Sequence, residues 1–256
     1  MTPLPSMAES TLATRYERPW DVRDLRECLF YHTMDLPGVG TVHGEWDLRH
    51  DLGRYLGGEN LSDKLVLEIG PASGCLTFHM ESMGANVTAV DVDETTAWDI
   101  VPRSGLNMTE ALATRRAGAR LLRNGFWFAY KQFHSRARVV YTNVYDLPPD
   151  IGNFDVAVLG MVLLHLRDPL LALSKCAEHA NTLIVTELLP SGLSDQPVCR
   201  LLPSLDNPTY DTWWSISPAF LVQFLQVLGF PRIAVSSHSA LFRGNDYPLY
   251  TVVASR

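Results

Sequence analysis

The chain has 256 residues, of which 46% are hydrophobic, and its formal net charge is −7. This length fits one large domain with a buried core, and the acidic balance argues against nucleic-acid binding unless basic residues gather locally. The four cysteines have no metal-ligand spacing, and the N-terminus has no apolar stretch. The longest apolar run, residues 156–164, is too short to cross a bilayer. We therefore expect a cytoplasmic protein with reduced thiols and no membrane anchor.

The first sixty residues divide into two predicted parts. Residues 1–20 are rich in Pro, Ser and Thr, which is typical of a flexible arm. Residues 21–60 form an N-terminal segment, in which apolar spacing predicts one helix over 21–30 and another over 48–57. Residues 30–47 have no helical or strand period. Because they enter just ahead of the first core strand, we interpret them as a lid that folds across the carboxyl ends of the strands.

From residue 61 to residue 256, short apolar strands alternate with helices, which predicts an α/β fold with a mostly parallel sheet covered on both faces. The predicted strands are 65–69, 87–91, 138–142, 154–160, 182–189, 233–237 and 247–255, and the predicted helices are 74–83, 168–179 and 218–228. A short loop joins the last two strands, which suits a hairpin and makes the last strand antiparallel. Residues 95–137 exceed one crossover helix, so we expect an elaboration there that includes a helix over 109–125.

The sequence VLEIGPASG, residues 66–74, carries the clearest chemical signal. Gly70 begins a turn after the first strand and Gly74 opens a helix, so backbone N–H groups can approach a ligand closely. Asp91 ends the second strand, where a carboxylate can accept both hydroxyls of a ribose. Glu68 would be unfavourable beside a pyrophosphate but suits a positively charged amino-acid tail. The pattern favours S-adenosylmethionine (SAM) over NAD or a turn without a ligand.

VLEIGPASG, VTAVD and FDVAVLGMVLLHLRDP resemble motifs of the class I SAM-dependent methyltransferases over about residues 60–255. The resemblance implies a Rossmann-like sheet of seven strands with a reversed last strand. It also implies that the first strand end holds the methionine part of SAM, the second the ribose and the third the adenine. The residues that it implies for cofactor binding are Glu68, Gly70, Ala72, Gly74, Asp91, Val92, Asn143 and Val144. Ala72 replaces a usual glycine, and Asn143 stands where aspartate is commoner.

A closer resemblance rests on FYHTMDLPG…GEWDLR, NVYDLP, LLHLRDPLLAL and WWSIS. These stretches are similar to the group around the tRNA wobble-uridine carboxymethyltransferase and its small-molecule relatives. The RNA-modifying members have an extra N-terminal region and basic residues for RNA and a carboxylated cofactor. Here about sixty residues precede the core and they are not strongly basic. We expect ordinary SAM and a small-molecule acceptor; the alternatives are a tRNA-modifying enzyme and a SAM-binding protein without catalysis.

Two histidines are candidates for the base that an acceptor hydroxyl needs. His165 follows the fourth strand at the cofactor end of the sheet, although it could equally be a packing or capping residue. His32 lies in the lid, where we expect Tyr31 to face the cofactor or acceptor and Trp46 to cover the cleft. Histidines and acids do not cluster at ligand spacing, so no metal is expected.

Two further groups have open interpretations. Trp213 and Trp214 wall an apolar or aromatic substrate, or else plug the core over the sheet. Arg116, Arg120 and Arg123 follow one side of the helix predicted over 109–125. A face of this kind touches RNA or an anionic substrate in some proteins, but it is more often simply solvated.

Overall fold

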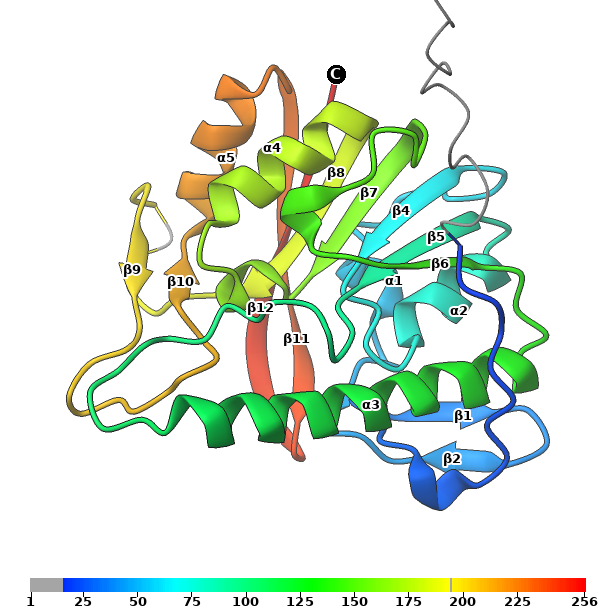
Figure 1. Ribbon diagram of the computed structural model, residues 1–256. Helices are drawn as coiled ribbons and strands as arrows, with labels where there is room; N and C mark the ends of the chain where they lie inside the picture. Colours follow the sequence, from blue (N-terminus) through cyan, green and yellow to red (C-terminus); the bar gives the residue numbers. More distant parts are fainter. Residues whose placement is uncertain (1–15, 194) are drawn as a thin grey trace, which may run out of the picture.

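The computed structural model describes residues 16–193 and 195–256, and within them one eight-stranded sheet has helices on both faces (Figure 1). The strands in sheet order are β3 (Trp46–Asp47), β11 (Arg232–Phe242), β12 (Asn245–Ser255), β8 (Ala180–Leu188), β7 (Phe154–Gly160), β4 (Leu65–Ile69), β5 (Asn86–Asp91) and β6 (Arg138–Tyr141). β12 is antiparallel to β8 and β11, whereas the strands from β8 to β6 pair in parallel. The Rossmann-like sheet with a reversed last strand is confirmed, and β3 adds a strand that the sequence does not predict.

Burial on both faces explains why the central strands are continuous apolar runs. In β4, Leu67 and Ile69 face the core cluster under α4 (Pro169–His179) and α5 (Pro218–Val227). Val66 faces the opposite cluster, under α1 (Leu52–Tyr55) and α2 (Cys75–Ser82). A strand covered on both sides has no solvent-facing position, so polar residues do not alternate along it. The same two-residue period turns Glu68 toward α2, on the side of Val66.

Local capping signals fix the starts of α4 and α5. Asp168 precedes Pro169, and Ser217 precedes Pro218; each cap side chain accepts a backbone N–H from the first helical turn. The cap satisfies a donor that has no partner within the helix, and proline lacks the N–H that would be unpaired at the first helical position. Both predicted helix starts therefore lie within one residue of the observed ones.

The elaboration between β5 and β6 contains one long helix, α3 (Met108–Gln132), which extends beyond the predicted 109–125. It runs past the carboxyl ends of the strands, below the sheet in Figure 1. Its apolar C-terminal half, which includes Phe126 and Trp127, packs with residues of α2, β5 and β6. The N-terminal half has fewer buried residues, so it is free to border a cavity.

The N-terminal segment is less helical than predicted. The helix predicted over 21–30 is only a 3-10 turn, η1 (Leu25–Glu27), because its following residues bond to α3: Leu29 N–H donates to the Leu121 carbonyl oxygen over 2.9 Å. Gly125 permits this approach, since a Cβ there would clash with the Leu29 carbonyl oxygen. The helix predicted over 48–57 is reduced to the single turn of α1.

Residues 30–47 contain strands instead of the irregular loop that we expect from the sequence. β1 (Met34–Leu36) and β2 (Gly40–Val42) form a hairpin, and β3 pairs with β11. Arg49 ties this segment together, because its guanidinium bonds to Asp35 at 2.9 Å and to Asp47 at 2.7 Å. Tyr31 N–H also donates to Ser73 Oγ over 3.1 Å, which anchors the segment to the loop after β4.

The remaining described segments complete the edges of the fold. Residues 1–15 of the predicted flexible arm lie outside the described residues, but Glu17 N–H donates to the Val139 carbonyl oxygen of β6 over 2.8 Å. A separate two-stranded sheet consists of β9 (Cys199–Leu201) and β10 (Trp214–Ile216). No helix in the described parts of the chain is long and apolar enough to span a membrane.

The close approach at Gly44 gives a test of the lid packing. A Cβ at Gly44 would lie 2.5 Å from the carbonyl carbons of Tyr31 and His32, so we expect Gly44→Ala to lower the free energy of unfolding by about 1–3 kcal/mol. Gly53 in α1 has open space around its Cβ position and no positive φ, so Gly53→Ala should be neutral or slightly stabilising. Urea denaturation of both variants measures the difference; equal effects would contradict the packing described here.

Candidate functional site

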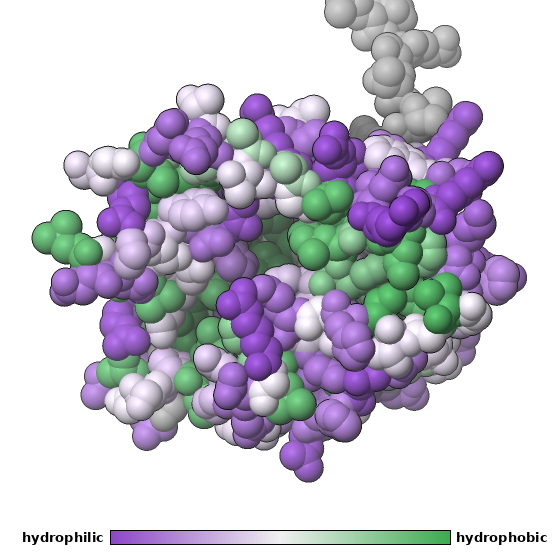
Figure 2. All heavy atoms as spheres, turned by 90° about the horizontal axis from the view of Figure 1, so that it is seen from below, coloured by the Kyte–Doolittle hydropathy of each residue, from purple (hydrophilic) through white to green (hydrophobic). Residues whose placement is uncertain are grey.

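A cavity of about 570 Å³ lies at the carboxyl ends of β4, β5 and β7, between these strands, α3 and the start of the lid. Figure 2 views this side of the molecule and shows a hollow near its centre, with hydrophobic residues deep between hydrophilic ones. Ligands of open α/β sheets bind at this edge, because the loops that follow parallel strands meet there. Seven residues of α3 line the cavity: Thr114, Arg115, Gly118, Ala119, Leu122, Arg123 and Phe126.

The loop after β4 has an unusual backbone. Gly70, Ala72 and Gly74 all have positive φ, at 73°, 50° and 91°. Gly70 and Ala72 line the cavity, and a Cβ at Gly70 would lie 2.7 Å from Val162 Cγ2. Ala72 holds the left-handed conformation at a cost of about 1 kcal/mol, which packing around the loop must offset. Gly74 does not line the cavity; a side chain there would collide with the Phe78 ring.

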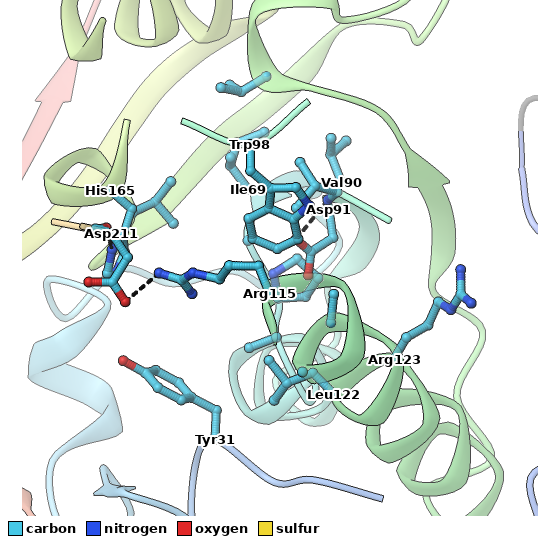
Figure 3. A pocket seen from close by; sticks show the side chains of 18 of the residues that line it. Tyr31, Ile69, Val90, Asp91, Trp98, Arg115, Leu122, Arg123, His165 and Asp211 are labelled. Atoms are coloured by element: carbon cyan, nitrogen blue, oxygen red, sulfur yellow. Dashed lines mark hydrogen bonds and ion pairs between the residues drawn. The ribbon is translucent and has the colours of Figure 1, made fainter. Parts of the chain in front are cut away.

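Asp91 ends β5 with its carboxyl group at the cavity (Figure 3). Its Oδ1 accepts the Val92 N–H at 2.8 Å. Burial raises the pKa of Asp91 to about 7, although N–H donors of Val92 and Ala72 oppose this shift. A buried carboxyl with spare acceptor capacity would gain from the hydroxyl donors of a ligand, since hydrogen bonds to the charged form lower its pKa.

Asn143 and Val144 follow β6 and also line the cavity. The Asn143 side chain caps the 3-10 turn η2 (Val144–Asp146) by accepting the Tyr145 N–H at 3.0 Å. Val144 is 5% exposed and Val92 borders the same space, so two apolar side chains flank this end of the cavity. The sequence places these residues correctly at the cavity, although their contact with a ligand stays a prediction.

Glu68 does not line the cavity, which corrects its expected place beside a cofactor tail. It is 1% exposed, and its Oε2 accepts a hydrogen bond from Thr77 Oγ1 of α2 over 2.5 Å. Burial raises the pKa of Glu68 to about 8. The reason is its position in the strand, because Leu67 and Ile69 take the other face of the sheet.

His165 lies at the opposite end of the cavity from Asp91 (Figure 3). It belongs to the 3-10 turn η3 (Leu163–His165), and its Nδ1 is 2.6 Å from the Asp211 carbonyl oxygen. A carbonyl oxygen only accepts, so Nδ1 carries the proton and Nε2 of the neutral ring has a free lone pair. Burial lowers the pKa of His165, which keeps the ring neutral at neutral pH.

The lid contributes Tyr31 and His32 to the cavity wall. Their rings meet edge to face, with centroids 5.0 Å apart. Burial lowers the pKa of His32 to about 4, and its Nδ1 has no hydrogen-bond partner among the described residues. A neutral imidazole with an unpaired nitrogen beside a cavity can orient a ligand by one hydrogen bond, whereas proton uptake near neutral pH is unfavourable.

Trp46, expected to cover the cleft, does not line the cavity, and neither do Trp213 and Trp214, whose interpretation the sequence leaves open. Trp46 is 6% exposed and packs against Phe242, with ring centroids 4.8 Å apart, because β3 pairs with β11. Trp213 Nε1 donates to the Asp99 carbonyl oxygen over 2.7 Å, and Trp214 Nε1 donates to the Leu166 carbonyl oxygen over 2.9 Å. Trp213 and Trp214 therefore connect loops next to the cavity by hydrogen bonds, and neither forms part of its wall.

Residues that the sequence does not single out complete the wall. Trp98, Tyr210 and Asp211 lie in two irregular segments joined by the hydrogen bond from Val101 N–H to the Tyr210 carbonyl oxygen, 2.9 Å long. Among the arginines of α3, Arg115 and Arg123 line the cavity, whereas Arg116 and Arg120 are exposed. Within the described residues, no group of three or more His, Cys, Asp or Glu side chains is placed to hold a metal ion.

Comparison with known proteins finds no matching family model and no matching curated protein. Solved structures do match. Magnesium protoporphyrin IX methyltransferase from Synechocystis PCC 6803, with bound S-adenosylhomocysteine (SAH), is 17% identical with a TM-score of 0.52, over 81% of this chain and 82% of that one. The N-terminal domain of EvdMO1, with SAH and D-fucose, is 17% identical with a TM-score of 0.54, over 90% and 92%.

A third match is 1,6-didemethyltoxoflavin-N1-methyltransferase from Burkholderia thailandensis, with bound 1,6-didemethyltoxoflavin and SAH. It is 17% identical with a TM-score of 0.50, over 82% of this chain and 78% of that one. At this identity the likeness concerns the fold. The chain therefore shares the Rossmann-like fold of these methyltransferases.

Glu68 makes stability depend on pH. Between its ordinary pKa of 4.5 and its folded value of about 8, the folded state binds a proton that the unfolded state has lost, so stability falls as pH rises through this window. Glu68→Gln should reduce that slope and raise the free energy of unfolding at pH 8 by about 2 kcal/mol or more. Urea denaturation of the ligand-free protein at several pH values measures it, with the exposed Glu59→Gln as control; an unchanged slope would refute the neutral Glu68.

Proposed function

We propose that the chain is a SAM-dependent methyltransferase that acts on an oxygen or nitrogen of a small-molecule acceptor. The observation that carries the proposal is one cavity with two chemically different ends. One end has the close-approach loop of Gly70 and Ala72 with the Asp91 carboxyl, and the other has the neutral His165 ring. Solved structures of the same fold that contain bound SAM or SAH support it.

The residues at the first end fit the parts of SAM. Asp91 would accept the ribose hydroxyls, and Asn143 with Val92 and Val144 would surround the adenine. Gly70 would let the backbone approach the methionine part, because no side chain fits there beside Val162. A cavity of about 570 Å³ is within the usual range of roughly 300–1,000 Å³ for small-molecule sites.

Bound SAM supplies an electrophilic methyl group on a positively charged sulfur. The protein's own task is to hold an acceptor in line with it and to remove a proton from the attacking group. His165 suits the second task, because Asp211 fixes the proton on Nδ1 and leaves Nε2 as the acceptor. Tyr31 and His32, held over the loop by the bond to Ser73, suit the first.

A small acceptor is favoured over RNA by the position of the arginines. Arg123 is 10% exposed and paired with Glu94, so it is not part of a solvated basic face. The exposed arginines of α3 that remain from the predicted stripe are Arg116 and Arg120. Two exposed arginines on this face of an acidic protein provide little attraction for a phosphate backbone. The bound acceptor in the toxoflavin methyltransferase structure supports a small molecule in this fold.

Asp91 gives the first test of the cofactor. Asp91→Asn should raise the dissociation constant for SAH at least about tenfold, since it weakens hydrogen bonds to a charged acceptor. Isothermal titration calorimetry measures this, with the exposed Asp246→Asn as control. Methyl-labelled SAM with wild-type protein and a metabolite extract should label small molecules and lose this activity in Asp91→Asn. Label confined to RNA, or unchanged SAH affinity in the variant, would refute the proposal.

His165 gives a test of the base. His165→Ala should lower kcat about 10²–10⁴-fold while SAH affinity stays unchanged, because the ring serves proton transfer and not cofactor binding. Burial holds the His165 pKa below its ordinary 6.5, so kcat/KM of the wild type should fall only below that pH as the ring gains a proton. Steady-state rates over a pH series measure both; a variant with the wild-type rate and profile would exclude this role.

A further inference from the structure

One ion pair crosses the wall of the cavity. Arg115 extends from α3 to Asp211, which lies in the segment between β9 and β10 (Figure 3). The side chains of Arg115 and Asp211 are 27% and 36% exposed, and both residues line the cavity. Because Arg115 is accessible from the cavity, a carboxylate in the cavity can replace Asp211 as its ion-pair partner while the Arg115 side chain stays in position.

The surroundings of Arg115 are flat and aromatic. Its guanidinium carbon lies 5.7 Å from the Trp98 ring centroid and 5.8 Å from the Tyr210 ring centroid. Trp98 Nε1 is buried without a hydrogen-bond partner among the described residues, and Trp98 lines the same cavity. A guanidinium binds a planar carboxylate with two parallel hydrogen bonds, and the two rings near it suit an aromatic ligand.

Arg123, the other arginine of the wall, is held more firmly. Its side chain is 10% exposed, bonds to Glu94 and stacks on the Trp20 ring with its guanidinium carbon 3.9 Å from the centroid. Releasing it would break the stacking on Trp20 and leave Glu94, whose Oε2 already has no partner among the described residues, without its ion pair. Arg115 is therefore the exchangeable cation among the described cavity residues.

Asp211 can give up Arg115 at little cost. Its Oδ2 makes the ion pair, but its Oδ1 already accepts hydrogen bonds from Thr209 Oγ1 at 3.0 Å and Thr212 Oγ1 at 3.2 Å. The partly exposed carboxylate would stay hydrogen-bonded after the exchange. Arg115 would stay paired as well, because one carboxylate replaces another.

Arg115 also borders the acceptor end of the cavity. Its partner Asp211 provides the carbonyl oxygen that orients His165, and its charge contributes to lowering the pKa of His165 after the larger effect of burial. Burial raises the pKa of Tyr31 in the lid, and the positive charge of Arg115 slightly opposes this rise. A ligand carboxylate on Arg115 would thus place the rest of that ligand toward His165 and Tyr31.

We propose that Arg115 binds a carboxylate of the acceptor in exchange for Asp211, in a slot walled by Trp98 and Tyr210. This inference rests on the proposed methyl transfer and narrows its substrate class to small aromatic carboxylic acids whose hydroxyl or amine reaches His165. The acceptor is then held at its acid group, remote from the atom that is methylated.

The test uses matched aromatic acids and amides. Hydroxybenzoate and indole carboxylate isomers, each with its carboxamide, are titrated into SAH-saturated wild-type protein by calorimetry. We expect at least one acid to bind about tenfold or more tightly than its amide, because a charge-assisted pair is lost in the amide. Arg115→Gln should abolish this preference, Arg115→Lys should keep part of it, and Asp211→Asn should strengthen acid binding by removing the competing carboxylate.

The control is Arg116→Gln, which removes the same charge one residue away on the exposed side of α3 and should leave the preference unchanged. The inference is overturned if no acid binds more tightly than its amide, or if Arg115→Gln keeps the preference for the acid. It is also overturned if Arg115→Gln weakens SAH binding instead, because Arg115 would then bind the cofactor's own carboxylate. Titration without SAH separates the two proposals: an Arg115-dependent acid preference in a protein that does not bind SAH would refute the cofactor and retain the carboxylate slot.

Discussion

Four carboxyl groups are buried or half-buried at the carboxyl edge of the sheet, and each needs compensation because desolvation disfavours its charge. Glu68 and Glu187 both have pKa values raised to about 8, and they rely on hydrogen bonds from Thr77 and from the Leu163 N–H. Asp91 has only backbone donors, and Asp211 has a cation and two hydroxyls. The first two hold elements next to the cavity, whereas the last two line it.

The two ends of the cavity are built from different structural elements. The proposed cofactor end is built from the strand ends and the loop after β4, which are fixed by the parallel sheet. The proposed acceptor end is built from α3, the lid and the segment before β10, which come from separate parts of the chain; α3 packs on β5 and β6, and β3 of the lid pairs with β11. Under the proposed function, a cofactor end fixed by the sheet and an acceptor end assembled from other elements let one fold serve different acceptors.

Much of the fold follows from local patterns, and so does one half of the site. The bounds of β7 match the predicted 154–160, and the caps at Asp168 and Ser217 are readable directly, because these signals depend only on neighbouring residues. Strand ends likewise place Asp91 correctly at the cavity. The period of β4 could also have placed Glu68, since it alternates with Leu67 and Ile69. Arg115 and Trp46 could not be assigned, because the packing of α3 and the pairing of β3 with β11 decide which way they face.

Gly118 of α3 affects the space available in the cavity. A glycine within a helix costs roughly 0.5–1 kcal/mol relative to alanine, yet Gly118 lies in the middle of α3, borders the cavity and has no atom within 4 Å of its Cβ position. A Cβ at this position therefore meets no neighbouring atom, and a longer side chain would occupy part of the cavity. Under the proposed function, a larger residue at this position would reduce the space for the acceptor without altering the strand that ends at Asp91.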